Sequence, residues 1–134
     1  QGAADVVQPD LSHAGGITEV MRIAGMADAY DVALAPHCPL GPIAFATCIQ
    51  LDTSIHNAIM QAQNLDIHDP TGNEHLAYLE DPTVFGFENG YVTPPDGPGL
   101  GIDIDEEYVR QQSQTELDWQ NPIWYHHDGS VAEW

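Results

Sequence analysis

The amino-acid sequence predicts an α/β fold with a parallel sheet, and two observations carry the prediction. Three short apolar runs alternate with two segments of helical periodicity at intervals of roughly 25 residues, which suits strands joined by right-handed helical crossovers. The runs are apolar throughout, which predicts strands covered on both faces, as in a barrel or a doubly wound sheet. Because a complete eight-stranded barrel needs roughly 250 residues, the 134 residues are expected to supply only the last strands of a parallel (β/α) barrel, incomplete at its N-terminal side.

The first strand is expected at Ala4–Gln8, an apolar run that ends in a polar loop. A turn at Gly15 and Gly16 follows it. Apolar residues then recur with helical spacing from Ile17 to about Tyr30, and Thr18 is placed to cap this helix. The two glycines could also cradle an anion before the helix, but a tight turn explains them equally well.

The second strand is expected at Val32–Pro36 and leads directly to His37. Helical spacing resumes over Ile43–Ser54, and Pro42 suits the first turn of that helix. A third apolar run, Asn57–Met60, completes the strand, helix, strand, helix, strand order. Residues 1–65 are therefore expected to form the closing strands and helices of the barrel domain.

Residues 66–134 have a different character, because Pro and Gly punctuate them throughout. They predict an irregular C-terminal segment with one short helix at Asp105–Gln112, capped by Asp105. Aromatic residues near the chain end are expected to anchor this tail on a larger body. They are Trp119, Trp124, Tyr125 and Trp134.

The charge balance excludes nucleic acid as a partner. Twenty-one acidic residues face only Arg22 and Arg110, and the formal net charge is -19. Concentrated salt screens such self-repulsion, so we expect a halophilic protein in a salt-rich cytoplasm; an ordinary acidic protein is the alternative. Cys38 and Cys48 are too few for a disulfide scaffold and are expected to be buried thiols in a reducing, cytoplasmic compartment. No apolar run is long enough to cross a membrane.

Two polar residues follow neighbouring strands at the edge where barrel enzymes build their active sites. Asp10 ends the first strand and His37 ends the second, so their side chains could touch. A carboxylate that accepts the imidazole N–H leaves the other ring nitrogen free to accept a proton, which makes a general-base dyad. A histidine held in an ordinary loop hydrogen bond is the alternative.

The other histidines show no zinc-like spacing, and we expect them on the surface or in loops, with His13 nearest the cleft. No metal site follows from them. The acidic cluster at Asp103–Glu107 lacks the alternating ligand pattern and central glycine of a calcium loop, so a solvated helix start explains it better.

Several segments closely resemble one enzyme family. They are QPDLSHAGGITE at Gln8–Glu19, APHCPLGPIA at Ala35–Ala44, PGLGIDIDE at Pro98–Glu106 and NPIWYHHDGSVAEW at Asn121–Trp134. The chain resembles sugar-acid dehydratases of the galactonate dehydratase type, in the mandelate racemase branch of the enolase superfamily. Only Asp66–Asp96 is loosely matched. The resemblance implies a modified barrel of the enolase-superfamily type, whose C-terminal segment packs on the barrel and on an N-terminal capping domain.

The resemblance also implies a reaction. His37 matches the general base that removes the proton next to the substrate carboxylate, and Asp10 matches its dyad partner. A sugar acid such as galactonate, or a related aldonic acid, would lose water to give a 2-keto-3-deoxy acid, with Mg²⁺ as cofactor. His13, Gln61 and Ala62 are the expected substrate-binding positions, although the family carries a glutamate where this chain has Ala62.

The family's acidic metal ligands and its second catalytic histidine lie on earlier strands, so no metal ligand is expected in this chain and the chain alone is expected to be inactive. Its implied partners are the substrate, the remainder of the barrel with the capping domain, and further copies of the full-length protein in a homo-oligomer. A non-catalytic split or decayed fragment that needs a partner is the main alternative. An acidic cation-binding protein is a third.

Overall fold

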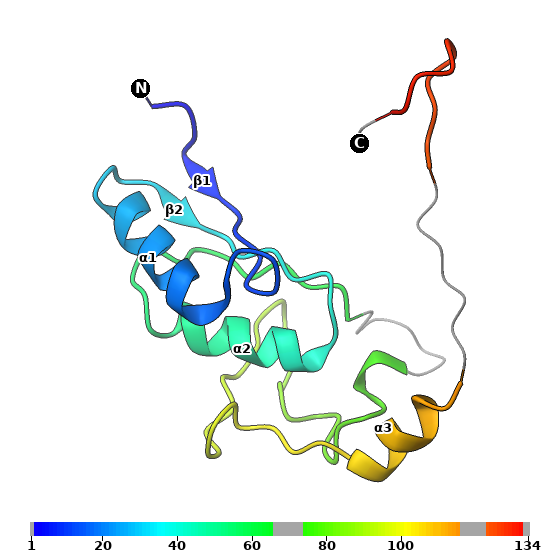
Figure 1. Cartoon of the computed structure of the whole chain (residues 1–134). Coiled ribbons are helices and arrows are strands. Elements are labelled where there is room, and N and C mark those ends of the chain that lie inside the picture. Colours follow the sequence, from blue (N-terminus) through cyan, green and yellow to red (C-terminus); the bar gives the residue numbers. More distant parts are fainter. Residues whose placement is uncertain (1, 66–73, 116–122, 133–134) are drawn as a thin grey trace.

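The computed structural model describes residues 2–65, 74–115 and 123–132. Its first half holds two parallel strands, β1 (Val6–Val7) and β2 (Ala33–Leu34), joined by helix α1 (Gly16–Asp28). Helix α2 (Pro42–Asp52) follows β2 and lies beside α1 (Figure 1). This order confirms the predicted α/β architecture with a parallel sheet.

The apolar run Asn57–Met60 takes the third position in the sheet, although it pairs too briefly to count as a strand. Leu34 and Ala58 form a parallel bridge. The Leu34 N–H donates to the Asn57 carbonyl at 2.8 Å, and the Ile59 N–H donates to the Leu34 carbonyl at 2.9 Å. The order of the three segments across the sheet therefore follows their order in the chain.

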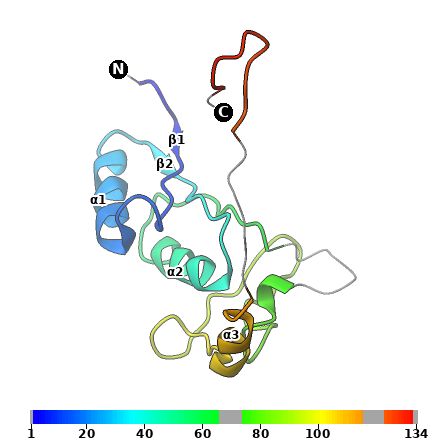
Figure 2. The same cartoon turned by 45° about the vertical axis from the view of Figure 1, so that its right-hand side comes forward.

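Both helices pack on one face of this sheet. Consecutive parallel strands with right-handed crossovers require this arrangement, and the two views of the ribbon show the helices on the same side (Figure 2). On the third segment, the Ile59 and Met60 side chains remain 64% and 69% exposed. The covering of both faces is therefore incomplete in the described part of this chain, which is expected to supply only the closing strands of a barrel.

The start of α1 differs from its prediction. Gly15 is the N-cap in a left-handed conformation with φ 95°, and Gly16 also has a positive φ of 76°. No side chain caps the helix. Two residues that tolerate positive φ let the chain turn straight into the helix, so Thr18 lies within the first turn and the expected Thr18 cap is wrong. Pro42 occupies the first turn of α2, as predicted.

The core lies between the helices and the sheet and extends under the C-terminal half. Phe45 of α2 packs edge-on against Phe85, with ring centroids 4.9 Å apart, and stacks on Phe87 at 5.7 Å. These aromatic contacts fasten the segment around residue 85 to α2. Cys38 and Cys48 lie in the same core as free, buried thiols, as predicted.

Residues 74–115 contain a short 3₁₀ helix, Glu74–Leu76, and helix α3 (Glu106–Gln112). The Asp105 carboxylate accepts the Tyr108 N–H at 2.8 Å, which confirms the predicted cap. The remainder is irregular, as expected. The division at residue 65 stays a prediction, because residues 66–73 lie outside the described part.

Residues 124–132 form a hairpin-like turn, in which Tyr125 and Val131 make an antiparallel bridge. Trp124 and Tyr125 are exposed, so their anchoring role stays a prediction. Trp119 and Trp134 lie outside the described residues. Among the described residues, no helix is long and apolar enough to span a membrane.

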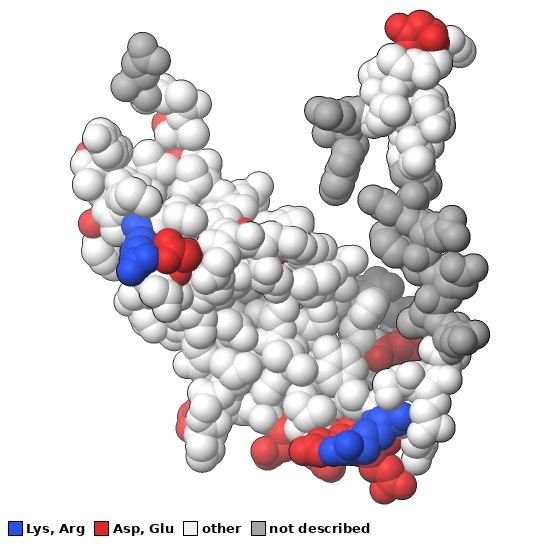
Figure 3. Space-filling model, in the orientation of Figure 1, with Lys and Arg blue, Asp and Glu red and all other residues white. Residues whose placement is uncertain are grey.

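Acidic side chains far outnumber basic ones, and each arginine is paired locally. Arg22 contacts Glu19 one turn away, and Arg110 lies 2.8 Å from Glu106. Figure 3 shows both blue side chains against red ones, with the larger acidic group around α3. The two arginines therefore offset only two of the 21 acidic charges, which leaves the net charge of -19.

Candidate active site

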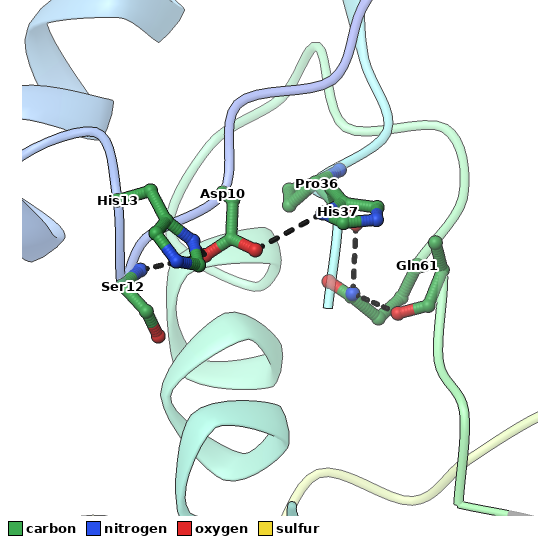
Figure 4. Close-up of polar contacts among 7 residues, drawn as sticks. Asp10, Ser12, His13, Pro36, His37 and Gln61 are labelled. Atoms are coloured by element: carbon green, nitrogen blue, oxygen red, sulfur yellow. Dashed lines mark hydrogen bonds and ion pairs between the residues drawn. The ribbon is translucent and has the colours of Figure 1, made fainter. Parts of the chain in front are cut away.

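Asp10 and His37 lie side by side at the carboxyl ends of neighbouring strands, as predicted. They form a parallel backbone bridge, and the His37 N–H donates to the Pro9 carbonyl at 3.1 Å. Their side chains meet directly: Nδ1 of His37 lies 3.0 Å from Oδ2 of Asp10 (Figure 4). The strand register therefore creates the contact.

The Asp10 carboxylate is fixed through both oxygens. Oδ1 accepts the Ser12 N–H at 2.8 Å, while Oδ2 faces His37. Burial raises the pKa of Asp10, but hydrogen bonds from Ser12, His37 and His13 outweigh burial and hold the pKa below its ordinary value. Because an ionised carboxylate only accepts hydrogen bonds, Nδ1 of His37 carries a proton and Nε2 is left as the proton acceptor.

The two members of the dyad differ in exposure. The Asp10 side chain is only 11% exposed, whereas the His37 side chain is 53% exposed. The buried carboxylate orients the ring, and the exposed ring can meet a ligand. This division suits a general base with an orienting partner.

His13 lies on the other side of the same carboxylate. Its Nδ1 is 3.3 Å from Oδ1 of Asp10, and its ring is largely exposed. The structure therefore brings His13 to the dyad, as predicted. Its substrate-binding role stays a prediction.

Gln61 and Ala62 follow the third segment of the sheet, beside the strand end that carries His37. Nε2 of Gln61 donates to the Pro36 carbonyl at 2.9 Å and also to the Ala62 carbonyl (Figure 4). The Ala62 N–H donates to the same Pro36 carbonyl at 3.3 Å. Oε1 of Gln61 is buried and has no hydrogen-bond partner. The Gln61 amide thus engages backbone, and its substrate-binding role stays a prediction.

Metal binding is not supported by the residues that the structure describes. No three His, Cys, Asp or Glu side chains in that part of the chain lie close enough together to hold an ion. The described residues therefore do not fit a Mg²⁺ site. Of the histidines expected on the surface, five are exposed, and His68 lies outside the described residues; the five are His13, His56, His75, His126 and His127.

The sequence did not predict the electrostatic behaviour of the two cysteines or of Asp52. Cys38 follows His37 and shares a hydrogen bond with Cys48, which lowers the pKa of the Cys38 thiol and, with burial, raises that of Cys48. Burial raises the pKa of Asp52, at the end of α2, to about 7. For Asp52, the only signal in the sequence is an acidic residue at the end of a largely apolar helix.

The parallel strands, joined by helices on one side, form the closing part of a parallel (β/α) barrel. Residues 1–108 match the family described as Enolase C-terminal domain-like, and the chain belongs to that family. Over 133 residues it is 57% identical to the D-galactonate dehydratase of Ralstonia nicotianae and 56% identical to that of Ralstonia pickettii. Each match covers 99% of this chain and 35% of the relative, so the chain spans about a third of their length.

Solved structures agree with this placement. An enolase from Agrobacterium radiobacter, bound to sodium and L-malate, superposes with a TM-score of 0.76 and 32% identity, over 96% of this chain and 34% of that one. A mandelate racemase/muconate lactonizing enzyme from Sulfitobacter sp. superposes with a TM-score of 0.71 and 34% identity, over 92% and 31%. Both matches confirm the predicted relationship to the enolase superfamily.

Proposed function

We propose that this chain forms the base-carrying part of a sugar-acid dehydratase that acts on galactonate or a related aldonic acid. The contact between Asp10 and His37 is the observation that carries the proposal. The D-galactonate dehydratases to which the chain is similar support the substrate class.

The chemistry follows from the dyad. Nε2 of His37 removes the proton from the carbon next to the substrate carboxylate, and the ionised Asp10 stabilises the imidazolium that forms. Loss of hydroxide from the neighbouring carbon, with a proton supplied to it, yields water and an enol. The enol then tautomerises to a 2-keto-3-deoxy acid, so the overall change is the loss of one water.

The proposal includes Mg²⁺ as the cofactor, held by residues outside this chain. A divalent cation supplies electrostatic stabilisation to a carboxylate that gains negative charge. The catalytic acid would also lie outside the chain, so the 134 residues alone are expected to be inactive. We further propose that the full-length enzyme is a homo-oligomer, is halophilic and acts in the cytoplasm.

The test compares two histidines that each contact an aspartate. The natural gene product is incubated with galactonate and MgCl₂, and the 2-keto acid is measured as its semicarbazone. We expect His37→Ala to lower kcat by roughly 10²- to 10⁴-fold, the usual contribution of a general base. His56 lies 3.0 Å from Asp28 on the surface, and His56→Ala is the matched control that should leave the rate unchanged. Full activity after His37→Ala would contradict the proposal.

A non-catalytic polypeptide that pairs with the rest of a barrel is the second candidate. The largely exposed Ile59 and Met60 side chains of the third segment, at the edge of the sheet, favour it. The intact mass of the natural gene product separates the two candidates. A mass near 14.6 kDa, with no turnover, supports the second.

A further inference from the structure

We propose that Gln61 is a positioning residue for His37, because its side-chain amide donates to the Pro36 carbonyl where a regular ladder would use the residue 61 N–H. The inference rests on the proposed function only in taking His37 as the base. It assigns Gln61 a role distinct from contact with substrate.

The backbone ladder on the β1 side of β2 is regular. The N–H groups of Ala33, Ala35 and His37 donate in turn to carbonyls of the preceding strand, at 3.0, 3.0 and 3.1 Å. The strand end that carries His37 is therefore well held along this side.

The other side of β2 is regular only as far as Leu34. The Leu34 N–H donates to the Asn57 carbonyl, and the Ile59 N–H donates back to the Leu34 carbonyl. A parallel ladder would continue with an N–H from residue 36 and a bond from the residue 61 N–H to the carbonyl of residue 36. Residue 36 is a proline and has no N–H, so the ladder is interrupted one residue before His37.

The Gln61 side chain supplies the donor that the Pro36 carbonyl would take from the residue 61 N–H in a regular ladder. Its Nε2 donates to the Pro36 carbonyl at 2.9 Å, a shorter bond than the 3.3 Å contact from the Ala62 N–H. Nε2 also donates to the carbonyl of Ala62, which fixes the amide at both of its hydrogens. One side chain thus ties the peptide between Pro36 and His37 to the third segment of the sheet.

Burial limits the replacement by water of the hydrogen bond from Gln61 to the Pro36 carbonyl. Pro36 is fully buried and Gln61 is half-buried, so water does not readily replace the amide. Without it, the carbonyl of Pro36 keeps only the weaker Ala62 donor, and the adjoining peptide is held mainly by the His37 N–H bond to Pro9 on the β1 side. The His37 ring hangs from that peptide, and its 3.0 Å contact with Asp10 depends on the ring's orientation.

The first test is a split between kcat and KM in the natural gene product. Gln61→Met keeps the length of the side chain and removes the donor. We expect kcat for galactonate to fall roughly 10- to 100-fold, as a displacement of about 1 Å in a base does, with KM within about twofold. Gln63→Met is the matched control: Gln63 accepts the Leu65 N–H at 2.6 Å on the same segment, and its loss should leave kcat within about twofold.

A rise in KM with unchanged kcat would mean that Gln61 contacts substrate, and it would overturn the inference. Equal losses in the Gln61 and Gln63 variants would overturn it as well. Gln61→Asn keeps the amide but shortens its reach by one methylene, and a smaller loss of kcat than in Gln61→Met is expected. If Gln61→Met does not fold, Gln61→Asn takes its place in this measurement.

The second test needs no activity. A crystal structure of the Gln61→Met protein should show the Nδ1–Oδ2 separation between His37 and Asp10 lengthened beyond 3.5 Å, a hydrogen-bonding limit. An unchanged separation would overturn the inference. If the wild-type protein does not dehydrate galactonate, the proposed function fails, and the crystal structure still decides the role of Gln61.

Discussion

Nδ1 of His37 lies 3.0 Å from Oδ2 of Asp10, although 27 residues separate them in the chain. Backbone pairing produces this contact, since the same two residues form a parallel bridge. The side chains of paired residues point to the same side of a sheet. The dyad is therefore a product of strand register, and several measurable consequences follow from its geometry and surroundings.

Asp10→Asn should lower kcat strongly, while the protein stays folded. The amide of asparagine can present its N–H₂ to His37, which favours a proton on Nε2 and removes the acceptor nitrogen. We expect a loss of roughly 10³-fold in kcat, in line with carboxylate-to-amide changes in other dyads. Steady-state rates with galactonate check this prediction. Asp28→Asn removes the partner of the exposed His56 and is the control, which should leave kcat unchanged.

The Asp10 carboxylate should also contribute stability that depends on pH. Its folded pKa is below the ordinary value, so the contribution is present above roughly pH 4 and is lost as pH falls through the folded pKa. Urea unfolding of wild type and Asp10→Asn should therefore show a difference near pH 6 that shrinks in acid. A constant difference across this range would contradict the hydrogen bonds assigned to Asp10.

Ala62→Glu should raise the rate. The related family pattern carries a glutamate at this position, and Ala62 lies beside the Pro36 carbonyl next to His37. A positioned hydrogen-bonding group in an active site contributes roughly 10²- to 10³-fold, and we expect an increase on the order of tenfold from the introduced carboxylate. Gln63→Glu adds the same charge nearby and is the control. A lower rate in Ala62→Glu would mean that the alanine is itself an adaptation.

Asp52→Asn should stabilise the protein in alkaline solution. Burial raises the pKa of Asp52 to about 7, and its Oδ1 has no hydrogen-bond partner. A raised carboxyl pKa means that the folded state binds the proton more tightly, so stability falls as pH rises from roughly 4 to about 7. The neutral amide removes this penalty.

Urea unfolding at fixed salt tests the Asp52 prediction. The free energy of unfolding of Asp52→Asn should exceed that of wild type by about 1 kcal/mol at pH 8, and the gain should vanish near pH 4. Asp96→Asn is the control, because the Asp96 side chain is exposed. A gain that is equal at both pH values would rule out titration of Asp52 as its cause.

Gly41→Ala should destabilise the start of α2. A Cβ at Gly41 would lie 2.2 Å from the hydroxyl oxygen of Tyr78, and that hydroxyl accepts the Ile43 N–H. Overpacking of this kind costs about 1–3 kcal/mol. Thermal unfolding should show the cost reduced in a Tyr78→Phe background, which removes the clashing atom. Gly25→Ala in α1 meets no atom within 4 Å and should be neutral or slightly stabilising.

Added salt should raise the free energy of unfolding steeply. The net charge is -19, and the Arg22 and Arg110 side chains are each occupied by a neighbouring glutamate. Repulsion among exposed carboxylates is screened when the Debye length falls from roughly 10 Å at 0.1 M to 3 Å at 1 M. The urea midpoint should rise between 0.2 M and 2 M KCl. A midpoint that does not change would exclude the halophilic interpretation.

Local sequence determined most of the helical structure. Pro42 in the first turn of α2 and Asp105 as the cap of α3 were predictable, because both effects depend only on residues within one turn. The expected Thr18 cap failed for a local reason too, since the two glycines before it start the helix earlier. Spacing of apolar runs was enough to predict parallel strands and to place Asp10 and His37 at neighbouring strand ends, where their side chains could touch; the contact itself came from the structure.

Tertiary structure decided how the site is held together. The sequence showed Pro36 and Gln61 only as neighbours of strand ends, whereas the fold joins them through a side-chain bond of 2.9 Å. The raised pKa of Asp52 was likewise invisible, because it depends on burial by segments distant in the chain. Periodicity and caps are local properties that a sequence records directly. Burial and long-range hydrogen bonds depend on which segments meet, and that is settled only when the chain packs.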